Sequence, residues 1–176
     1  MVHHRRVFLL FPVVMAAILG SFLVAGPAQA ATTFRNIVNF GSEKCVDVRT
    51  QNGFTVQLYS CNGNDNKVFN FDAREFDVNG NTLYLIHPKS NTNHCLAPAN
   101  NVSNIGREIH STGCDTRTNV NQEWRLLTHV INNRTWHEIQ HVPSGLCMTV
   151  RGGAGANGTI IEQNICNASP ADLWRI

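Results

Sequence analysis

The chain has 176 residues, 43% of them hydrophobic, and a formal net charge of +2. Both arginines of the N-terminal leader, at positions 5–6, are part of this charge, so the 146 residues after position 30 carry 12 basic and 12 acidic side chains. This balance argues against binding to nucleic acids or anionic membranes, because such binding depends on many Lys and Arg contacts. A length of 146 residues suits one domain with one core.

Residues 1–30 are expected to be a secretory signal peptide. A basic start at 3–6 precedes an apolar run over 7–25, and the sequence AQA at 28–30 is a small-x-small cleavage site. An uncleaved anchor is the alternative, because the apolar run approaches the roughly 20 residues that span a bilayer. The arginine pair also fits a twin-arginine signal, but that route carries folded proteins and suits a disulfide-bonded chain poorly. We therefore expect cleavage after residue 30, a secreted protein and no membrane insertion of the mature chain.

The cysteines of the mature chain indicate three disulfides. An even number of cysteines in an exported chain is typical of a disulfide framework, although six cysteines allow fifteen pairings. A metal site is the alternative, and no Cys-x-x-Cys spacing supports it. Neighbouring cysteines are separated by 16, 19 and 19 residues, and the first members recur after 50 and 52 residues, so repeat symmetry favours pairing neighbours. The expected pairs are Cys45 with Cys61, Cys95 with Cys114, and Cys147 with Cys166.

The cysteine pairs belong to three copies of one unit, at about residues 34–76, 77–129 and 130–176. Each copy has an alternating apolar stretch, a first cysteine, a short strand-like run with the second cysteine, and a polar turn before an aromatic residue. The apolar stretches centre on Ile37, Ile86 and Ile139, and the aromatic residues are Phe69, Trp124 and Trp174. Short runs rich in Val, Ile, Thr and aromatic residues alternate with Asn-Gly turns, which is typical of strands. One unit cannot bury its apolar face alone, so we predict an all-β domain of three units around one axis.

Three short motifs of the first copy suggest a family. They are CVDV at 45–48, QLYSC at 57–61 and NKVF at 66–69, and the other copies add NQEW at 121–124 and DLW at 172–174. With these motifs the chain resembles a ricin-type lectin domain, a β-trefoil of three such repeats. The resemblance covers about residues 34–176. It implies a carbohydrate partner, no cofactor and no metal.

The resemblance implies one sugar site, in the first copy. Asp47 would accept hydrogen bonds from two neighbouring sugar hydroxyls, Tyr59 would stack on the sugar ring, and Gln57 and Asn66 would complete the polar contacts. Lys67 replaces the family's Gln, and its ammonium can donate to a hydroxyl or to Asp47. Taken singly, Asp47 could cap a turn and Tyr59 could be an ordinary strand residue. Their combination in the family's register favours a sugar site. Phe69 replaces the family's Trp and is expected in the core.

The second and third copies lack this combination. In the second copy the positions of Asp47, Gln57 and Tyr59 hold Ala97, His110 and Thr112. In the third copy the same positions hold Thr149, Glu162 and Asn164, and Ala171 occupies the position of Asn66. The second copy can neither hold a diol nor stack on a ring. The third keeps polar groups without an aromatic plate, so a weak site there is a minor alternative. We therefore expect a monomer with one shallow site and millimolar to high-micromolar affinity, roughly −4 to −6 kcal/mol.

Two other motifs occur in an unsuitable context. The sequence His137-Glu138-Ile139-Gln140-His141 matches the zinc-protease motif His-Glu-x-x-His, which requires a helix. The segment alternates like a strand, in which residues four apart are roughly 13 Å apart, too far for one zinc ion. The run GAGANG at 153–158 matches a dinucleotide fingerprint but precedes a strand-like run, so no helix N-terminus would meet the phosphate. A zinc-dependent hydrolase is therefore a minor alternative.

The type of sugar and the class of function stay open at this point. The resemblance slightly favours galactose-like sugars, but it also implies plant polysaccharides, because binders of xylan and arabinan share these residues. A protein-binding trefoil with a vestigial sugar site, such as a protease inhibitor or a toxin's targeting subunit, is the main alternative. A glycosidase is disfavoured because a small trefoil has no cleft between two facing carboxylates. We predict a secreted lectin that is not an enzyme.

Overall fold

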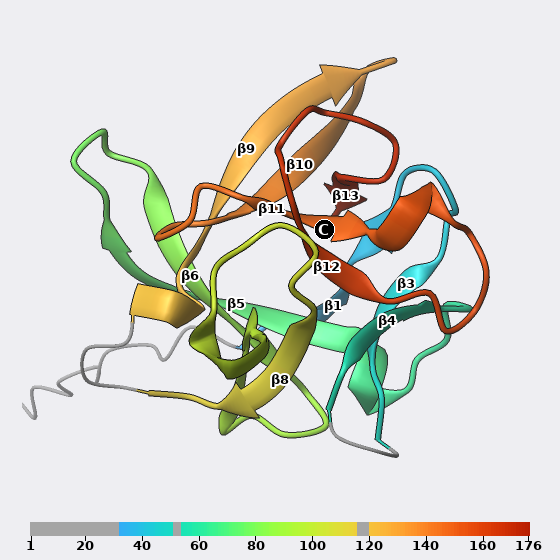
Figure 1. The fold of residues 1–176 in the computed structure, drawn as a ribbon, viewed down its shortest axis with the longest axis horizontal. Coiled ribbons are helices and arrows are strands. Elements are labelled where there is room, and N and C mark those ends of the chain that lie inside the picture. The colour runs from blue at the N-terminus through green and yellow to red at the C-terminus, as the bar shows by residue number, and fades with distance from the viewer. Residues whose placement is uncertain (1–31, 51–53, 116–119) are drawn as a thin grey trace, which may run out of the picture. The chain divides into compact units, whose positions relative to one another are not determined.

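The computed structural model of the protein describes residues 32–50, 54–115 and 120–176, which contain strands and single turns of 3₁₀ helix but no α-helix (Figure 1). The strands are β1 (Arg35–Asn36), β2 (Val38–Asn39), β3 (Cys45–Val48), β4 (Val56–Tyr59), β5 (Val68–Phe76), β6 (Thr82–Pro88), β7 (His94–Pro98), β8 (Ile109–Gly113), β9 (Trp124–Ile131), β10 (Arg134–His141), β11 (Cys147–Val150), β12 (Ile161–Asn164) and β13 (Leu173–Arg175). The 3₁₀ turns are η1 (Asp65–Lys67), η2 (Ala99–Asn101), η3 (Val120–Gln122) and η4 (Arg151–Gly153). Within the described ranges no helix is long and apolar enough to cross a membrane. The predicted signal peptide lies outside these ranges.

Antiparallel strands close a barrel in the described part of the chain. They pair in the order β1, β5, β6, β9, β10, β13 and β2. Because β1 and β2 are two parts of one extended segment on either side of Ile37, this order returns to its starting point. The two hairpins β5–β6 and β9–β10 are the longest paired units and project from the barrel in Figure 1. The strands β5, β6, β9, β10, β13 and β2 each have a partner on both sides, which protects their edges from pairing with other chains.

Three further hairpins, one from each repeat, have the same register. In β3–β4, β7–β8 and β11–β12, the first cysteine of the repeat lies opposite Tyr59, Thr112 and Asn164, respectively. Single bridges join the hairpins pairwise, for example Thr55 with His110 and Glu108 with Glu162. The hairpins therefore form a three-membered ring beside the barrel. This arrangement confirms the predicted all-β trefoil and the alignment of the three copies.

The core consists of the apolar residues that recur in each repeat. The three isoleucines that begin the repeats and the three aromatic residues that end them, including Phe69, are fully buried. The indole N–H groups of Trp124 and Trp174 donate to the carbonyls of Leu96 and Met148, at 2.9 and 3.0 Å. Phe69 fills the equivalent volume without such a donor, as expected for a core position. The repeats thus share one centre because each contributes the same two buried positions.

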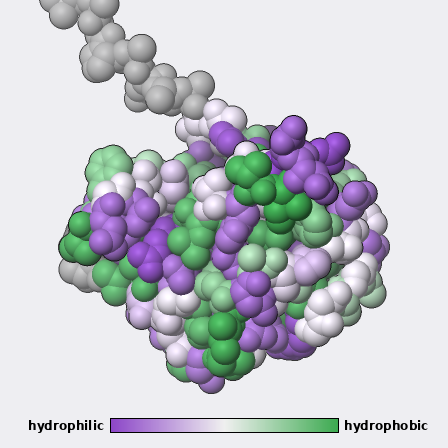
Figure 2. Space-filling model, turned by 90° about the horizontal axis from the view of Figure 1, so that it is seen from above, coloured by the Kyte–Doolittle hydropathy of each residue, from purple (hydrophilic) through white to green (hydrophobic). Residues whose placement is uncertain are grey.

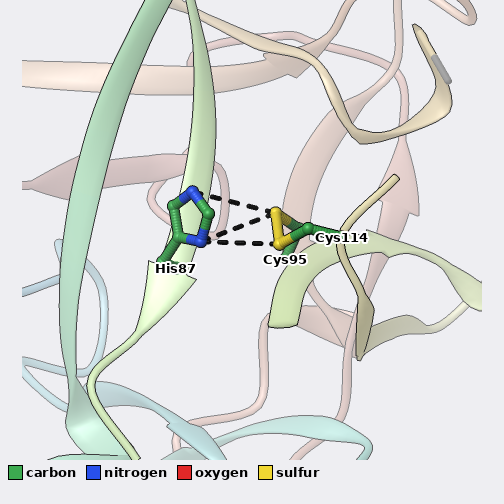
Figure 3. A group of neighbouring side chains, drawn as sticks. All are labelled: His87, Cys95 and Cys114. Atoms are coloured by element: carbon green, nitrogen blue, oxygen red, sulfur yellow. Dashed lines mark hydrogen bonds between the residues drawn. A yellow bond between two sulfur atoms is a disulfide. The ribbon is translucent and has the colours of Figure 1, made fainter. Parts of the chain in front are cut away.

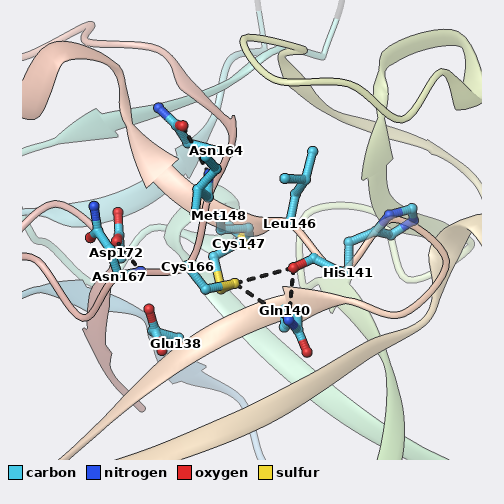
Figure 4. The surroundings of a disulfide bond; sticks show 12 residues. Glu138, Gln140, His141, Leu146, Cys147, Met148, Asn164, Cys166, Asn167 and Asp172 are labelled. Atoms are coloured by element: carbon cyan, nitrogen blue, oxygen red, sulfur yellow. Dashed lines mark hydrogen bonds between the residues drawn. A yellow bond between two sulfur atoms is a disulfide. The ribbon is translucent and has the colours of Figure 1, made fainter.

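The three predicted disulfides are confirmed: Cys45–Cys61, Cys95–Cys114 and Cys147–Cys166. Polar side chains of the preceding strand contact two of them. His87 lies against the second bridge, with Nδ1 at 3.7 and 3.5 Å from the two sulfurs (Figure 3). Gln140 donates to a sulfur of the third bridge at 3.5 Å (Figure 4). His87 and the two cysteines resemble a metal-ligand set, but sulfurs joined in a disulfide are not thiolates and cannot serve as ligands.

The face of the molecule in Figure 2 has no large area that is only hydrophobic or only hydrophilic. On the face that Figure 2 shows, hydrophobic residues are interspersed with hydrophilic ones. The exposed large hydrophobic residues are Phe54, Tyr59, Phe76, Val78, Val102, Ile105, Val120, Val130 and Ile165. Of these, Tyr59 lies beside a group of buried polar side chains.

Candidate functional site

The first-repeat hairpin forms the floor of a shallow depression of about 450 Å³. All five predicted site residues line it: Asp47, Gln57, Tyr59, Asn66 and Lys67. Three further lining residues were not indicated by the sequence: Arg49, Thr50 and Gly158. Strand β3 carries the carboxylate, β4 carries the glutamine and the tyrosine, and η1 carries the asparagine and the lysine. The hairpin register places Asp47 directly opposite Gln57. The structure therefore brings the predicted residues together in one place.

Asp47 is the centre of the hydrogen bonds in this depression, and its side chain is only 4% exposed. Its Oδ2 accepts a hydrogen bond from Nε2 of Gln57 at 2.7 Å. Its Oδ1 accepts from Nδ2 of Asn66 at 2.5 Å and from Nζ of Lys67 at 3.1 Å. A carboxylate has about four acceptor positions. Three are occupied by the protein, so about one is left for a ligand.

Lys67 connects the carboxylate to the aromatic ring. Its side chain is 6% exposed, and its ammonium lies 5.2 Å from the centroid of the Tyr59 ring, which is a cation–π distance. An ammonium has three N–H donors, and one of them is directed at Asp47. The side chain of Tyr59 is 42% exposed. The depression therefore combines a buried charge pair with an exposed aromatic plate.

Arg49 and Gly158 shape the site from positions that the sequence did not single out. Nε and Nη2 of Arg49 both donate to Oε1 of Gln57, at 3.2 and 3.0 Å, which directs the amide nitrogen of Gln57 toward Asp47. Arg49 follows Asp47 by two residues, so strand alternation could have indicated it. Gly158 has φ +85° and belongs to a turn of the third repeat, for which no local signal pointed to this site. The glycine-rich run 153–158 leads into strand β12 and not into a helix, as predicted.

The equivalent positions of the other repeats hold no such combination. In the second repeat, Ala97 lies opposite His110 and offers no acceptor. In the third repeat, the Thr149 hydroxyl donates to the carbonyl of Cys147 at 3.2 Å. The Glu162 carboxylate accepts from Nε of Arg151. Neither place joins a free carboxylate to an aromatic ring, in agreement with the sequence comparison of the copies.

The His-Glu-x-x-His sequence lies on strand β10, as predicted, and its side chains have separate partners. The Glu138 carboxylate interacts with Nε2 of His129 at 2.8 Å and accepts from the backbone N–H of Ala168 at 2.7 Å. His141 is fully buried. Among the described residues, the groups that could hold a metal do not include His137 together with His141. The segment therefore has a structural role.

His141 is predicted to make the stability of the domain depend on pH. Burial lowers its pKa from 6.5 to about 4. Nε2 lies 3.0 Å from the carbonyl of Asn121, and Nδ1 lies 2.8 Å from the Ser144 hydroxyl, which suits a neutral ring with its proton on Nε2. The unfolded chain takes up a proton near pH 6.5, so the contribution of this group is complete above that pH. As the pH falls from about 6.5 to about 4, the free energy of unfolding decreases by about 3 kcal/mol through this group.

Urea unfolding of the wild type and of His141→Gln, at neutral pH and near pH 4, measures this contribution. The wild type should lose more free energy of unfolding on acidification than the variant. Equal losses in the two proteins would show that another group causes the acid sensitivity.

Comparisons with known proteins agree with the fold and the motifs. Residues 33–174 match the model of the ricin-type beta-trefoil lectin domain. A sequence search of curated proteins gave no significant match. Similar solved structures include the designed 3-fold symmetric protein ThreeFoil, with TM-score 0.67 and 21% identity over 81% of this chain and 96% of that chain. They also include the Macrolepiota procera ricin B-like lectin in complex with lactose, with TM-score 0.63 and 10% identity over 82% of this chain and 94% of that chain.

A third structure has the same fold as part of a longer chain. It is an exo-beta-1,3-galactanase from Clostridium thermocellum, with TM-score 0.67 and 20% identity over 84% of this chain but only 30% of that chain. At these identities the structures show a shared fold. The family model spans nearly all described residues and therefore shows more. This protein belongs to the ricin-type β-trefoil lectin domain family.

Proposed function

We propose that the protein is a secreted, non-catalytic lectin that binds a galactose-like or plant-polysaccharide sugar in the first-repeat depression. The observation that carries this proposal is the buried Asp47 carboxylate, oriented by Gln57, Asn66 and Lys67 beside the exposed ring of Tyr59. Sugar hydroxyls both donate and accept hydrogen bonds, and the apolar face of a sugar ring stacks on aromatic side chains. The depression offers these three kinds of contact within one hairpin and the turn that follows it.

The hydrogen-bond inventory fits a pair of neighbouring hydroxyls. One hydroxyl can donate to the remaining acceptor position of Asp47. Lys67 directs one of its three N–H donors at the carboxylate, which leaves donors for the oxygen of a second hydroxyl. The two N–H donors of Asn66 are directed at Asp47 and at the carbonyl of Val48, so its side-chain oxygen is the group that can accept from a hydroxyl. The cation of Lys67 thus takes the part that the glutamine has in the family motif.

The site supports binding and not glycoside hydrolysis. Hydrolysis of a glycosidic bond by the common mechanisms requires two carboxylates on either side of the bond. Asp47 is the only carboxylate among the described residues that line the depression. One shallow site gives roughly −4 to −6 kcal/mol, so strong attachment requires clustered glycans or several copies of the protein.

Replacement of Tyr59 by alanine is predicted to abolish measurable sugar binding while leaving the fold intact. The ring is 42% exposed, so its removal costs little core packing, but it removes the stacking surface. Isothermal titration with lactose and with xylan and arabinan oligosaccharides, in parallel with thermal melting, measures both effects.

The matched control is Thr112→Ala, because Thr112 occupies the position of Tyr59 in the second-repeat hairpin. This variant should bind like the wild type, and Tyr59→Trp should bind at least as well. If the wild type binds a sugar and Tyr59→Ala binds it equally, the sugar lies elsewhere and this assignment is wrong.

A further inference from the structure

A second concave surface adjoins the first-repeat hairpin, shares no lining residue with the first-repeat depression and has its own charge pattern. It is a cleft of about 580 Å³ lined by β2, β10, β13 and the first disulfide. We propose that this cleft binds acidic saccharides, in which a sugar ring carries a carboxylate or a sulfate. We name it the arginine cleft, after Arg134 and Arg175, which line it together with Trp136, Phe40, Glu43 and Asn36.

Both arginines of the cleft lack a counter-ion among the described residues. Some basic side chains elsewhere in these ranges have carboxylate partners, as in the pair of Lys89 with Asp65, and others donate to side-chain amides, as Arg49 does to Gln57. Neither Arg134 nor Arg175 forms an ion pair or a side-chain hydrogen bond to another described residue, and both are exposed. Two unneutralised guanidinium groups on one concave surface favour an anion, because each presents N–H donors in a planar fork.

The internal repeat provides a comparison for Arg175. Arg125 follows Trp124 in the second repeat as Arg175 follows Trp174 in the third. Nη1 of Arg125 lies 3.0 Å from a carboxylate oxygen of Asp77, and its Nε donates to Gln140 at 2.6 Å. The second repeat therefore supplies an internal anion for its arginine. The third repeat leaves the equivalent arginine open to the cleft.

Aromatic contacts hold Arg175 in place without using its donors. The guanidinium carbon lies 5.8 Å from the centroid of the Trp136 ring, and Phe40 contacts Trp136 edge-on at 4.7 Å. The strand register explains this, since β13 pairs with β10 on one side and places Arg175 opposite Val38 of β2 on the other. Stacking uses the flat face of the guanidinium, so the N–H groups on its edge are available to an oxyanion.

The remaining polar groups of the cleft favour a sugar as the carrier of the anion. Glu43 lines the cleft without an ion pair among the described residues, and Asn36 adds an amide whose nitrogen donates to the carbonyl of Lys67 at 2.9 Å. The Glu43 carboxylate repels a second anion but accepts hydrogen bonds from hydroxyls. A ligand with one oxyanion and several hydroxyls matches this pattern, as a hexuronate or a sulfated sugar does.

The test is an NMR titration of the full chain at low salt with methyl β-D-glucuronide and, separately, with methyl β-D-glucoside, which has a neutral hydroxymethyl group in place of the carboxylate. The glucuronide should shift the indole N–H signal of Trp136 and bind at least about tenfold more tightly than the glucoside. Glucose 6-sulfate should bind like the glucuronide. Added salt should weaken binding of both acidic sugars, because the contacts are ionic.

Three variants locate the binding. Arg134→Gln/Arg175→Gln should lose glucuronide binding by about tenfold or more, and thermal melting confirms that it is folded. Arg35→Gln is the matched control, since Arg35 also has no ion pair among the described residues but lies outside the cleft. Tyr59→Ala should keep glucuronide binding, which separates this site from the proposed lectin site.

Specific results would overturn the proposal. Equal affinity for glucuronide and glucoside would remove the role of the anion, and unchanged binding in the double arginine variant would remove the role of the cleft. Inorganic sulfate binding as tightly as glucose 6-sulfate would show an oxyanion site that does not recognise sugar. Binding of a Glu-rich peptide in the absence of any binding of acidic sugars would assign the cleft to a protein partner.

Discussion

Reduction of the three disulfides is expected to unfold the domain near physiological temperature. The bridges join cysteines 16, 19 and 19 residues apart. In the chain-entropy model a loop of this size contributes about 3 kcal/mol. Three such loops together contribute about 9 kcal/mol, which is comparable with the whole stability of a small domain, about 5–15 kcal/mol.

Thermal melting with and without reductant measures this effect, and mass spectrometry after alkylation counts the free thiols. The fully reduced protein should lose its cooperative transition or melt far below the oxidised protein. Replacing one pair, Cys147→Ala/Cys166→Ala, should cost about 3 kcal/mol. An unchanged melting temperature with six free thiols would show that the hairpin ring is held by its core alone.

Replacing Asp47 by alanine is expected to destabilise the domain by about 3–5 kcal/mol. Lys67 is 6% exposed, and its one carboxylate partner in the described chain is Asp47. The substitution would leave a buried ammonium without a counter-ion and would also remove the acceptor of Gln57 and Asn66. A loss of sugar binding in this variant would therefore report unfolding as well as a lost contact.

A double-mutant cycle separates the two contributions. Because removal of both charges leaves no unpaired ion, Asp47→Ala/Lys67→Met should recover most of the lost free energy of unfolding. Thr149→Ala is the matched control, since Thr149 occupies the position of Asp47 in the third repeat and makes one hydrogen bond to a carbonyl. It should cost about 1 kcal/mol. Equal destabilisation in the single and the double variant would contradict the view that the buried charge is the cause.

Features within one repeat could be predicted from the sequence. The two cysteines of each disulfide, and the two strands of each hairpin in the ring, lie within about 20 residues of each other. Pairing of neighbouring cysteines therefore indicated which two strands of a repeat lie side by side. The register of Asp47 with Gln57 and the burial of Phe69 follow from this local pairing. The sequence also indicated that Lys67 could donate to Asp47, and the structure has this contact.

Features between repeats could not be predicted in this way. Gly158 reaches the first-repeat depression because the third hairpin is bridged to the first, which no local pattern shows. The arginine cleft joins Glu43 of the first repeat with Arg134 and Arg175 of the third, through the pairing of β13 with β10 and β2. Such pairings follow from closure of the barrel.

A glycan-array screen of the protein beside the variant Asp47→Asn/Lys67→Gln tests most directly whether the first-repeat depression is the sugar site. This variant removes both charges while keeping similar side-chain volumes, so thermal melting should show that it remains folded. We predict that the wild type binds a defined galactose-like or plant-polysaccharide glycan and that the folded variant does not. Binding of the same glycan by the folded variant, with unchanged strength, would contradict the assignment of the first-repeat depression as the sugar site.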